Sequence, residues 1–297
     1  MSNVTTRPAP LPTWILRDGE TVAEVVPARG GLVSMFAVGP VAVLATDDEA
    51  VYGGGRNVRG GIPILFPTAG RLKDDRYIAR GVSRELKQHG FARDLAWRVV
   101  GQESSKAARL VMELESTEAM LRAFPWEFRL EFTVEVAGRS LRMLQSYENR
   151  SETRMPLHAG FHPYFAVPAR EKGAAGIEAP LARAWDKVAG REVSLQGFDL
   201  TAPEVSLSVL KTGETGAAAA AGAADTTVAR LSAPSLPAVE IEVSPELTQW
   251  VIWTLGGRDF LCVEPWTAPA DALNTGIGLL WLAPGERREM KLEVRLA

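Results

Sequence analysis

Histidine is scarce in this chain, and its placement is the first indication of chemistry. The 297 residues include only three histidines. His158 and His162 lie in residues 157–165 (LHAGFHPYF), and His89 lies in residues 88–93 (QHGFAR). Because imidazole titrates near neutral pH, it suits acid–base catalysis. The clustering therefore points to proton transfer, although any one of these rings could instead simply hydrogen-bond a loop.

The two histidines of residues 157–165 are expected to have different roles. Gly160 and Pro163 disfavour a helix, so we predict an extended chain with His158 and His162 about 13 Å apart on one face. That spacing disfavours one metal ion bound by both rings, and no metal is predicted. Pro163 has no amide hydrogen, so His162 should lie where the strand leaves its ladder at a cleft edge, with His158 deeper.

A carboxylate with an unusual setting is the second candidate. Glu264 follows the apolar residues 260–263 and precedes Pro265. Partial desolvation at such a strand end raises the pKa of a carboxyl group and makes it a better base. An exposed charge is the alternative, but the neighbouring Trp266 favours a pocket wall. Trp266 and Tyr164 could also stack on a sugar ring, although tryptophan is more often part of the core.

Composition excludes several functional classes. The formal net charge is −3, so no basic excess suggests a nucleic-acid partner. No apolar run is long enough to cross a membrane, and the polar N-terminus lacks the centre of a signal peptide. Cys262 is the one cysteine, which excludes an intrachain disulfide and a thiol-rich metal site. We therefore expect a cytoplasmic protein without a cofactor, built as a single domain over 1–297.

Hydrophobic patterning predicts an all-β protein. In residues 128–136 apolar and polar side chains alternate strictly, as in a strand with one face in the core. The number of short strands and the scarcity of helix predict a large antiparallel β-sandwich. Further strands are expected within 22–26, 32–38, 41–45, 97–100, 109–115, 140–147, 205–210, 228–233, 239–243, 250–254 and 290–296.

The remaining stretches are assigned to other structure. Residues 116–124 could form a short helix, and the apolar but Gly- and Pro-broken residues 59–71 should wall a pocket. Three prolines make residues 1–13 a loose tail. The Ala- and Gly-rich residues 171–190 and 213–225 are expected to be surface excursions without chemistry.

Four motifs, in this order, resemble the galactose mutarotase-like aldose 1-epimerases. They cover most of the chain from about residue 20 and comprise PxxFPxxGR at 63–71, HGFxRxxxW at 89–97, GFHPYF at 160–165 and CVEP at 262–265. The resemblance implies a large antiparallel β-sandwich with an open carbohydrate cleft and no metal or organic cofactor.

The same resemblance implies roles for individual residues. His162 would be the general acid, Glu264 the general base, and His89 would assist near the ring oxygen. Arg71 would bind sugar hydroxyls, and Phe198-Asp199 weakly matches a pair whose aspartate contacts hydroxyls in the galactose enzymes. The implied reaction is interconversion of sugar anomers through ring opening and closure.

The identity of the sugar is left open by the motifs. Phe161 and Ala166 replace asparagines that are usual in the galactose enzymes. Residues 59–63 and 88–93 are closer to the hexose-6-phosphate 1-epimerases, in which two arginines, here Arg59 and Arg93, help to bind phosphate. We favour a general aldose 1-epimerase over a glucose-6-phosphate 1-epimerase. A carbohydrate-binding protein that has lost activity is the alternative of another class.

Overall fold

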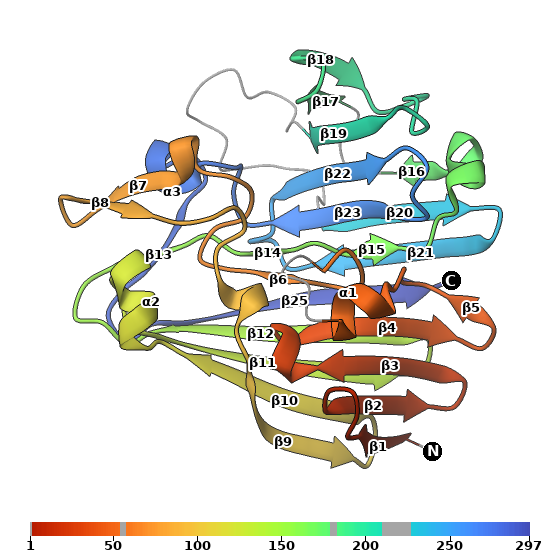
Figure 1. Ribbon diagram of the computed structural model, residues 1–297, viewed down its shortest axis with the longest axis horizontal. Helices are drawn as coiled ribbons and strands as arrows, with labels where there is room; N and C mark the ends of the chain where they lie inside the picture. The colour runs from red at the N-terminus through yellow and green to blue at the C-terminus, as the bar shows by residue number, and fades with distance from the viewer. Residues whose placement is uncertain (1, 54–57, 179–182, 210–226) are drawn as a thin grey trace.

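A computed structural model describes residues 2–53, 58–178, 183–209 and 227–297 as layered antiparallel sheets (Figure 1). The predicted all-β sandwich is confirmed. The helix expected within 116–124 is present as α2. In the described residues helical structure is confined to α1 (Asp48–Tyr52), α2 (Glu118–Ala123), α3 (Ala272–Thr275) and the 3-10 turns η1 (Pro27–Arg29), η2 (Lys73–Asp75), η3 (Ala92–Asp94) and η4 (Ala169–Ala174).

One sheet carries the central candidate residues and is called the site sheet below. The β15 strand (Tyr164–Phe165) pairs with β23 beside the main path of this sheet. The order of the path is β18 (Arg191–Ser194), β17 (Arg183–Asp186), β19 (Glu204–Val209), β22 (Gln249–Leu255), β23 (Leu261–Trp266), β14 (Gly160–Phe161) and β6 (Ile64–Leu65).

A second large sheet, called the back sheet, lies behind the site sheet. Its order is β16 (Gly176–Glu178), β20 (Val228–Ala233), β21 (Leu236–Val243), β25 (Arg287–Leu296), β12 (Ser140–Asn149), β11 (Phe128–Ala137), β10 (Ala108–Glu115) and β9 (Arg98–Ser104). Two separate pairs complete the fold, β13 (Met155–Leu157) with β24 (Leu280–Leu282) and β7 (Arg76–Ala79) with β8 (Val82–Glu85).

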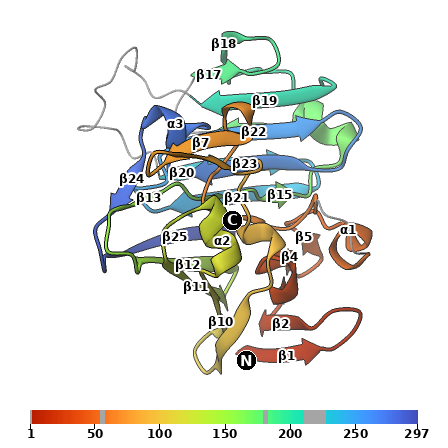
Figure 2. The same cartoon turned by 60° about the vertical axis from the view of Figure 1, so that its left-hand side comes forward.

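The N-terminal strands form a five-stranded sheet that continues the layer of the site sheet. Its order is β1 (Ser2–Arg7), β2 (Thr13–Asp18), β3 (Thr21–Val26), β4 (Leu32–Val38) and β5 (Val41–Ala42). Isolated bridges from Val33 to Ile62 and from Leu44 to Phe165 join it to the segments next to the site. Figures 1 and 2 show that these N-terminal strands lie against β9 to β11 of the back sheet. In the same way, β22 and β23 of the site sheet lie against β20 and β21 of the back sheet.

A continuous apolar core fills the space between the layers. One cluster of buried side chains includes residues from Leu16 to Leu296. The alternation in β11 places Phe128 and Phe132 in this core. Phe66 of the apolar loop 59–71 packs its ring 5.0 Å from that of Phe128. The loop that borders the site is therefore anchored in the core of the protein.

Two expectations from the sequence are wrong. Residues 1–13 are not a loose tail, because Ser2–Arg7 form β1 and pair with Thr13–Asp18 while the prolines fall in the connecting turn. Residues 171–190 are not only a surface excursion, because the Nζ atom of Lys187 lies 5.5 Å from the ring centroid of Trp266 on β23. The second Ala-rich segment, 213–225, lies outside the described residues. None of the helices in the described parts of the chain has the length and hydrophobicity of a membrane span.

The core explanation of the fold can be tested at Phe132, which packs against Trp97, Tyr147 and Phe161. Phe132→Ala should lower the free energy of unfolding by about 3–5 kcal/mol, because it leaves a cavity in a tightly packed interior. Urea denaturation measures this. The control Leu144→Ala, at a side chain 39% exposed on β12, should cost less than about 1 kcal/mol. Equal losses in both variants would contradict the assignment of the core.

Candidate active site

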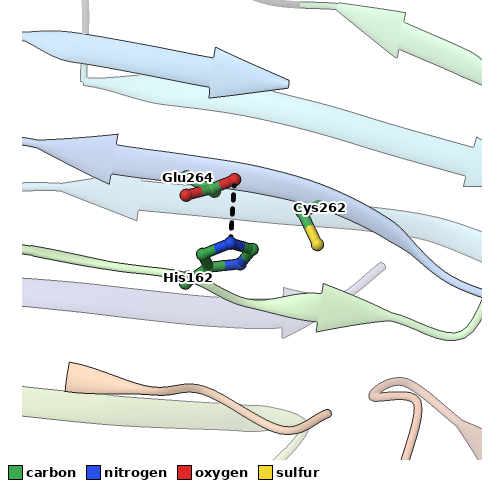
Figure 3. A group of neighbouring side chains, drawn as sticks. All are labelled: His162, Cys262 and Glu264. Carbon is green, nitrogen blue, oxygen red and sulfur yellow. Dashed lines mark ion pairs between the residues drawn. The ribbon is translucent and has the colours of Figure 1, made fainter. Parts of the chain in front are cut away.

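A buried imidazole and a buried carboxylate lie side by side on the site sheet. The Nε2 atom of His162 is 3.4 Å from the Oε1 atom of Glu264 (Figure 3). Only 7% of His162 and 1% of Glu264 is exposed. Two polar atoms of the pair, His162 Nδ1 and Glu264 Oε2, are buried without a hydrogen-bond partner. Because buried polar atoms are normally paired, these two atoms mark a place where a ligand would bind.

Backbone hydrogen bonds fix the position of His162. The residue lies between β14 and β15, where its amide donates to the carbonyl of Pro63 over 3.1 Å. The next amide along, that of Tyr164, donates to the carbonyl of Gly61 over 2.9 Å. The extended chain with a break at Pro163 agrees with the sequence prediction. The loop 59–71 thus holds the strand that carries the imidazole.

Aromatic rings surround the imidazole of His162 on several sides. Tyr164 stacks parallel to it with a centroid separation of 4.7 Å, and Trp253 meets it edge to face at 5.6 Å. Trp266, on the same face of β23 as Glu264, lies 5.9 Å from the ring of His89. The site therefore combines one acid–base pair with flat apolar surfaces that suit the faces of a sugar ring.

The His89 segment reaches the same place from another part of the chain. The ring of His89 is 5.4 Å from that of His162. Its backbone has φ of 68°, in the left-handed region that a residue with a side chain adopts only under constraint. Gly90 follows at φ of 69°, and a Cβ atom there would lie 2.3 Å from the carbonyl oxygen of Phe66. Glycine is therefore required for this turn to approach the loop.

Hydrogen bonds also set the proton positions of His89. Its Nδ1 atom accepts from the amide of Gly70 over 3.0 Å, so a neutral ring carries its proton on Nε2. The side-chain amide nitrogen of Gln88 lies 3.2 Å from that Nε2 atom, and because both are then donors, the amide must turn its oxygen toward the ring to accept from Nε2. Burial holds the pKa of His89 well below its ordinary value, and the charge of His162 contributes in the same direction. His89 is thus a neutral hydrogen-bond donor at neutral pH.

The same desolvation acts on the central pair. Burial lowers the pKa of His162 to about 3, and the positive charges of Arg93 and Arg59 also lower it. Burial raises the pKa of Glu264 well above its ordinary value, while the charges of Lys187 and Arg93 oppose this rise. Burial therefore destabilises both the imidazolium form of His162 and the carboxylate form of Glu264. The pair tends to exist as a neutral imidazole next to a neutral carboxylic acid, which share one mobile proton.

His158 makes hydrogen bonds to two other segments and none to the pair. Its ring is completely buried, and Nε2 lies 3.1 Å from the carbonyl of Ala268. Because Nε2 must donate to that carbonyl, Nδ1 accepts from the hydroxyl of Thr68 at 3.2 Å. With both nitrogens occupied and a pKa lowered by burial to about 4, the ring connects two loops in neutral form.

Two of the predicted arginines face the pair. The guanidinium of Arg59 lies 5.9 Å from the ring centroid of Trp253, and its charge acts on His162. Arg93 also acts on His162 and lines a neighbouring cavity of about 280 Å³ together with Pro63 and Lys87. These positions put positive charge on one side of the candidate active site.

Arg71 and Asp199 occupy different surroundings. Arg71 follows the Gly70 that bonds to His89, but its side chain is exposed and lies 3.7 Å from Asp75. Asp199 is exposed and accepts two hydrogen bonds from Thr201. It borders a cavity of about 370 Å³ lined also by Ile252, which points to the face of the site sheet opposite Trp253. The structure therefore does not bring Asp199 to the other candidate residues.

Lys187 is a residue at the site that the sequence interpretation missed. It follows β17, and its Nζ atom lies 5.5 Å from the ring centroid of Trp266. Although part of the side chain is exposed, desolvation lowers the pKa of Lys187, and the charge of Glu264 opposes this shift. Trp185 and Lys187 are two residues apart, which would place both on one face of an extended chain. This spacing could not show that β17 pairs with β19, the neighbour of β22 and β23 in the site sheet.

Comparison with known proteins identifies the family of the chain. Residues 13–295 match the sequence model of the family described as Aldose 1-epimerase. A curated relative, "Putative glucose-6-phosphate 1-epimerase" of Salmonella typhimurium, is 29% identical over 132 residues. That alignment covers 44% of this chain and 42% of the relative. The chain therefore matches less than half the length of this relative.

Solved structures support the same fold over nearly the whole length. The Slr1438 protein from Synechocystis sp. PCC 6803 superposes with a TM-score of 0.88 at 36% identity, covering 99% of both chains. A galactose mutarotase-like protein from Clostridium acetobutylicum has a TM-score of 0.80 at 18% identity, over 99% of this chain and 98% of its own. At the lower identity the likeness concerns the fold alone.

The electrostatic role of Lys187 can be tested without an activity assay. Lys187→Met removes a positive charge that favours ionised Glu264 and keeps the length of the side chain. The pKa of Glu264 should therefore rise further above its ordinary value. Carbon-13 NMR titration of the Glu264 carboxyl measures it. Lys187→Arg, which keeps the charge, should leave the pKa close to that of the original protein. An unchanged Glu264 pKa in Lys187→Met would show that the ammonium group does not act on this carboxylate.

Proposed function

The chain belongs to the aldose 1-epimerase family, and we propose that it interconverts the α and β anomers of a hexose. The observation that carries this proposal is the contact between His162 and Glu264, an acid and a base 3.4 Å apart with one unpaired buried polar atom each. Mutarotation removes one proton from the C1 hydroxyl and delivers one to the ring oxygen. A buried pair that holds one mobile proton matches this requirement.

Glu264 takes the proton of the C1 hydroxyl, and His162 gives a proton to the ring oxygen. The C1–O5 bond of the hemiacetal then breaks to give the free aldehyde, the C1–C2 bond rotates, and ring closure re-forms C1–O5 and reverses both proton transfers. Before substrate binds, Glu264 is a carboxylic acid and His162 a neutral imidazole. This state has the same total number of protons as a carboxylate with an imidazolium ion, so moving one proton converts one state into the other. Sugar hydroxyls that donate to Glu264 favour the ionised carboxylate, and the proton moves to His162.

Neighbouring groups support the charge that develops during ring opening. His89 donates from Nε2, so it can hydrogen-bond the ring oxygen without changing its own protonation. Lys187 lies on the Glu264 side and favours the ionised base. Arg71 follows Gly70, whose amide bonds to His89, and this proximity supports a role for it in contacting sugar hydroxyls from the rim. Fixed donors of this kind need no reorganisation during the reaction, which lowers the barrier.

Removal of either proton-transfer group tests the mechanism. His162→Ala and Glu264→Gln should each lower the rate of anomer exchange by about 10²–10⁴-fold, the usual contribution of one acid–base group. Polarimetry or NMR exchange spectroscopy on glucose and galactose measures the rate, and circular dichroism checks the fold. Glu192→Gln, a carboxylate on β18 paired with Arg183, is the matched control and should remain fully active. Calorimetric sugar binding by the original protein without any anomer exchange would favour a non-catalytic binding protein instead.

A hexose 6-phosphate is the second candidate substrate, and the two arginines favour it. Arg59 and Arg93 both place positive charge near His162, and guanidinium groups bind phosphate through paired, charge-assisted hydrogen bonds. The curated relative from Salmonella typhimurium carries a matching name. In this version C6 of the sugar points toward the arginines while C1 lies at Glu264.

Activity on glucose and on glucose 6-phosphate separates the two substrates. If phosphate binds at the arginines, Arg59→Ala should lower kcat/KM for glucose 6-phosphate by about tenfold or more, equivalent to about 1.4 kcal/mol, and leave the glucose value unchanged. Arg150→Ala is the control, because Arg150 pairs with Glu115 outside the site. An equal effect of Arg59→Ala on both sugars would contradict the phosphate clamp.

A further inference from the structure

The chain's one cysteine lies beside the proton-transfer pair, and the mechanism above makes no use of it. Cys262 is two residues before Glu264 on β23, so both side chains are on the same face of the strand. It is completely buried. His162, Cys262 and Glu264 each offer one ligand atom, and these atoms all lie within 4.8 Å of one another (Figure 3).

We propose that His162, Cys262 and Glu264 form a binding site for Zn²⁺ and similar thiophilic divalent cations, and that occupation of this site stops anomer exchange. Metal binding follows from the three side chains alone. The inhibition rests on the proposed function, since it requires His162 and Glu264 to be the proton-transfer groups.

The donor set fits zinc. Imidazole nitrogen, thiolate sulfur and carboxylate oxygen are its usual ligands, and three protein ligands leave the fourth tetrahedral position open. Ligands about 2.0–2.1 Å from a tetrahedral ion lie about 3.3–3.4 Å apart. The separation between His162 Nε2 and Glu264 Oε1 is 3.4 Å, so these two atoms already have the required spacing. No two of the three ligand atoms are more than 4.8 Å apart, so we propose that a small rotation of the Cys262 side chain brings the sulfur to the distance of a zinc ligand.

Unpaired atoms make the site receptive to a ligand. His162 Nδ1 and Glu264 Oε2 have no hydrogen-bond partner in the described structure, although both side chains are more than nine-tenths buried. The proposed ligands are the other atoms of the same side chains, Nε2 and Oε1, so no hydrogen bond from Nδ1 or Oε2 has to be broken for the side chains to adjust to an ion. The Cys262 thiol and the Glu264 carboxylic acid each lose a proton to solvent as their bonds to the metal form, so Zn²⁺, thiolate and carboxylate together carry no net charge.

The surrounding charges restrict which cations can bind. Arg59 and Arg93 act on His162, and Lys187 acts on Glu264, so any cation meets repulsion from the protein. An ion that forms a strong bond to thiolate overcomes this repulsion. Mg²⁺ and Ca²⁺ prefer several oxygen ligands and gain little from a sulfur atom. The site should therefore distinguish Zn²⁺ and Cd²⁺ from the abundant hard cations.

Inhibition follows from the identity of the ligands. A metal ion on His162 and Glu264 occupies the lone pairs that exchange protons with the sugar. It also fills the space between them in which the C1 hydroxyl and ring oxygen would lie. Zinc should therefore compete with the sugar, and saturating sugar should relieve its effect.

Direct binding is tested with Cd²⁺, whose bond to a thiolate gives an ultraviolet charge-transfer band. Because the chain has one cysteine, that band reports Cys262 alone. The original protein should develop the band with one equivalent of Cd²⁺, added Zn²⁺ should abolish it, and Cys262→Ala should not show it. This measurement stands whether or not the protein has epimerase activity. Absence of the band in the original protein would overturn the proposed site.

Inhibition is tested with Zn²⁺ in the anomer exchange assay, with Mg²⁺ as the control cation. Cys262→Ala and Cys262→Ser should exchange anomers at the original rate but require at least tenfold more Zn²⁺ for half-inhibition. Two variants are used because the thiol packs beside Tyr164 and Phe260, and at least one small replacement should fold. Equal zinc sensitivity in the variants and the original protein would show that His162 and Glu264 bind the ion without the thiol, which contradicts the three-ligand site.

Discussion

Desolvation of an acid and a base held against each other is the constraint on which this site depends. Neither His162 nor Glu264 can keep an isolated charge at its degree of burial, so the pair resists both full ionisation and loss of its proton. Under the proposed function, sugar hydroxyl groups would hydrogen-bond this pair and favour its ionised form. The burial that destabilises charge in the pair would then make proton transfer depend on the presence of substrate.

The fold meets this constraint by holding the pair on backbone that cannot readily move. His162 lies on a strand bonded to the loop 59–71, and Glu264 lies in the middle of a sheet between β22 and β14. His89 joins them from a left-handed turn that Gly90 permits. Each segment is anchored in the apolar core through neighbours such as Phe66. Rigid anchoring matters because a mobile acid–base pair would lose conformational entropy each time a substrate molecule binds, and this loss would offset its contribution to catalysis.

Positive charges are distributed around the pair rather than in contact with it. Arg59 and Arg93 lie toward His162, while Lys187 lies toward Glu264. Together they favour the ionised base and disfavour the protonated acid, and they provide an anionic substituent with partners. They also oppose cations, so the metal site that we propose depends on the bond to the Cys262 thiolate. Under both proposals the same side chains would serve a sugar or a thiophilic metal, but not both at once.

The sequence by itself determined the class of the fold and most of the chemical groups. The alternation in residues 128–136 is a local property of a half-buried strand, and the pairing of rare histidines with glycine and aromatic residues marked the site segments. Tertiary structure alone decided which segments meet. Strand pairing joins residues far apart in the chain, so nothing local to Lys187 or Cys262 disclosed their neighbours, and nothing local to Asp199 placed it outside the site. The N-terminal residues became strand β1 for the same reason, because their partner, not their composition, determines their conformation.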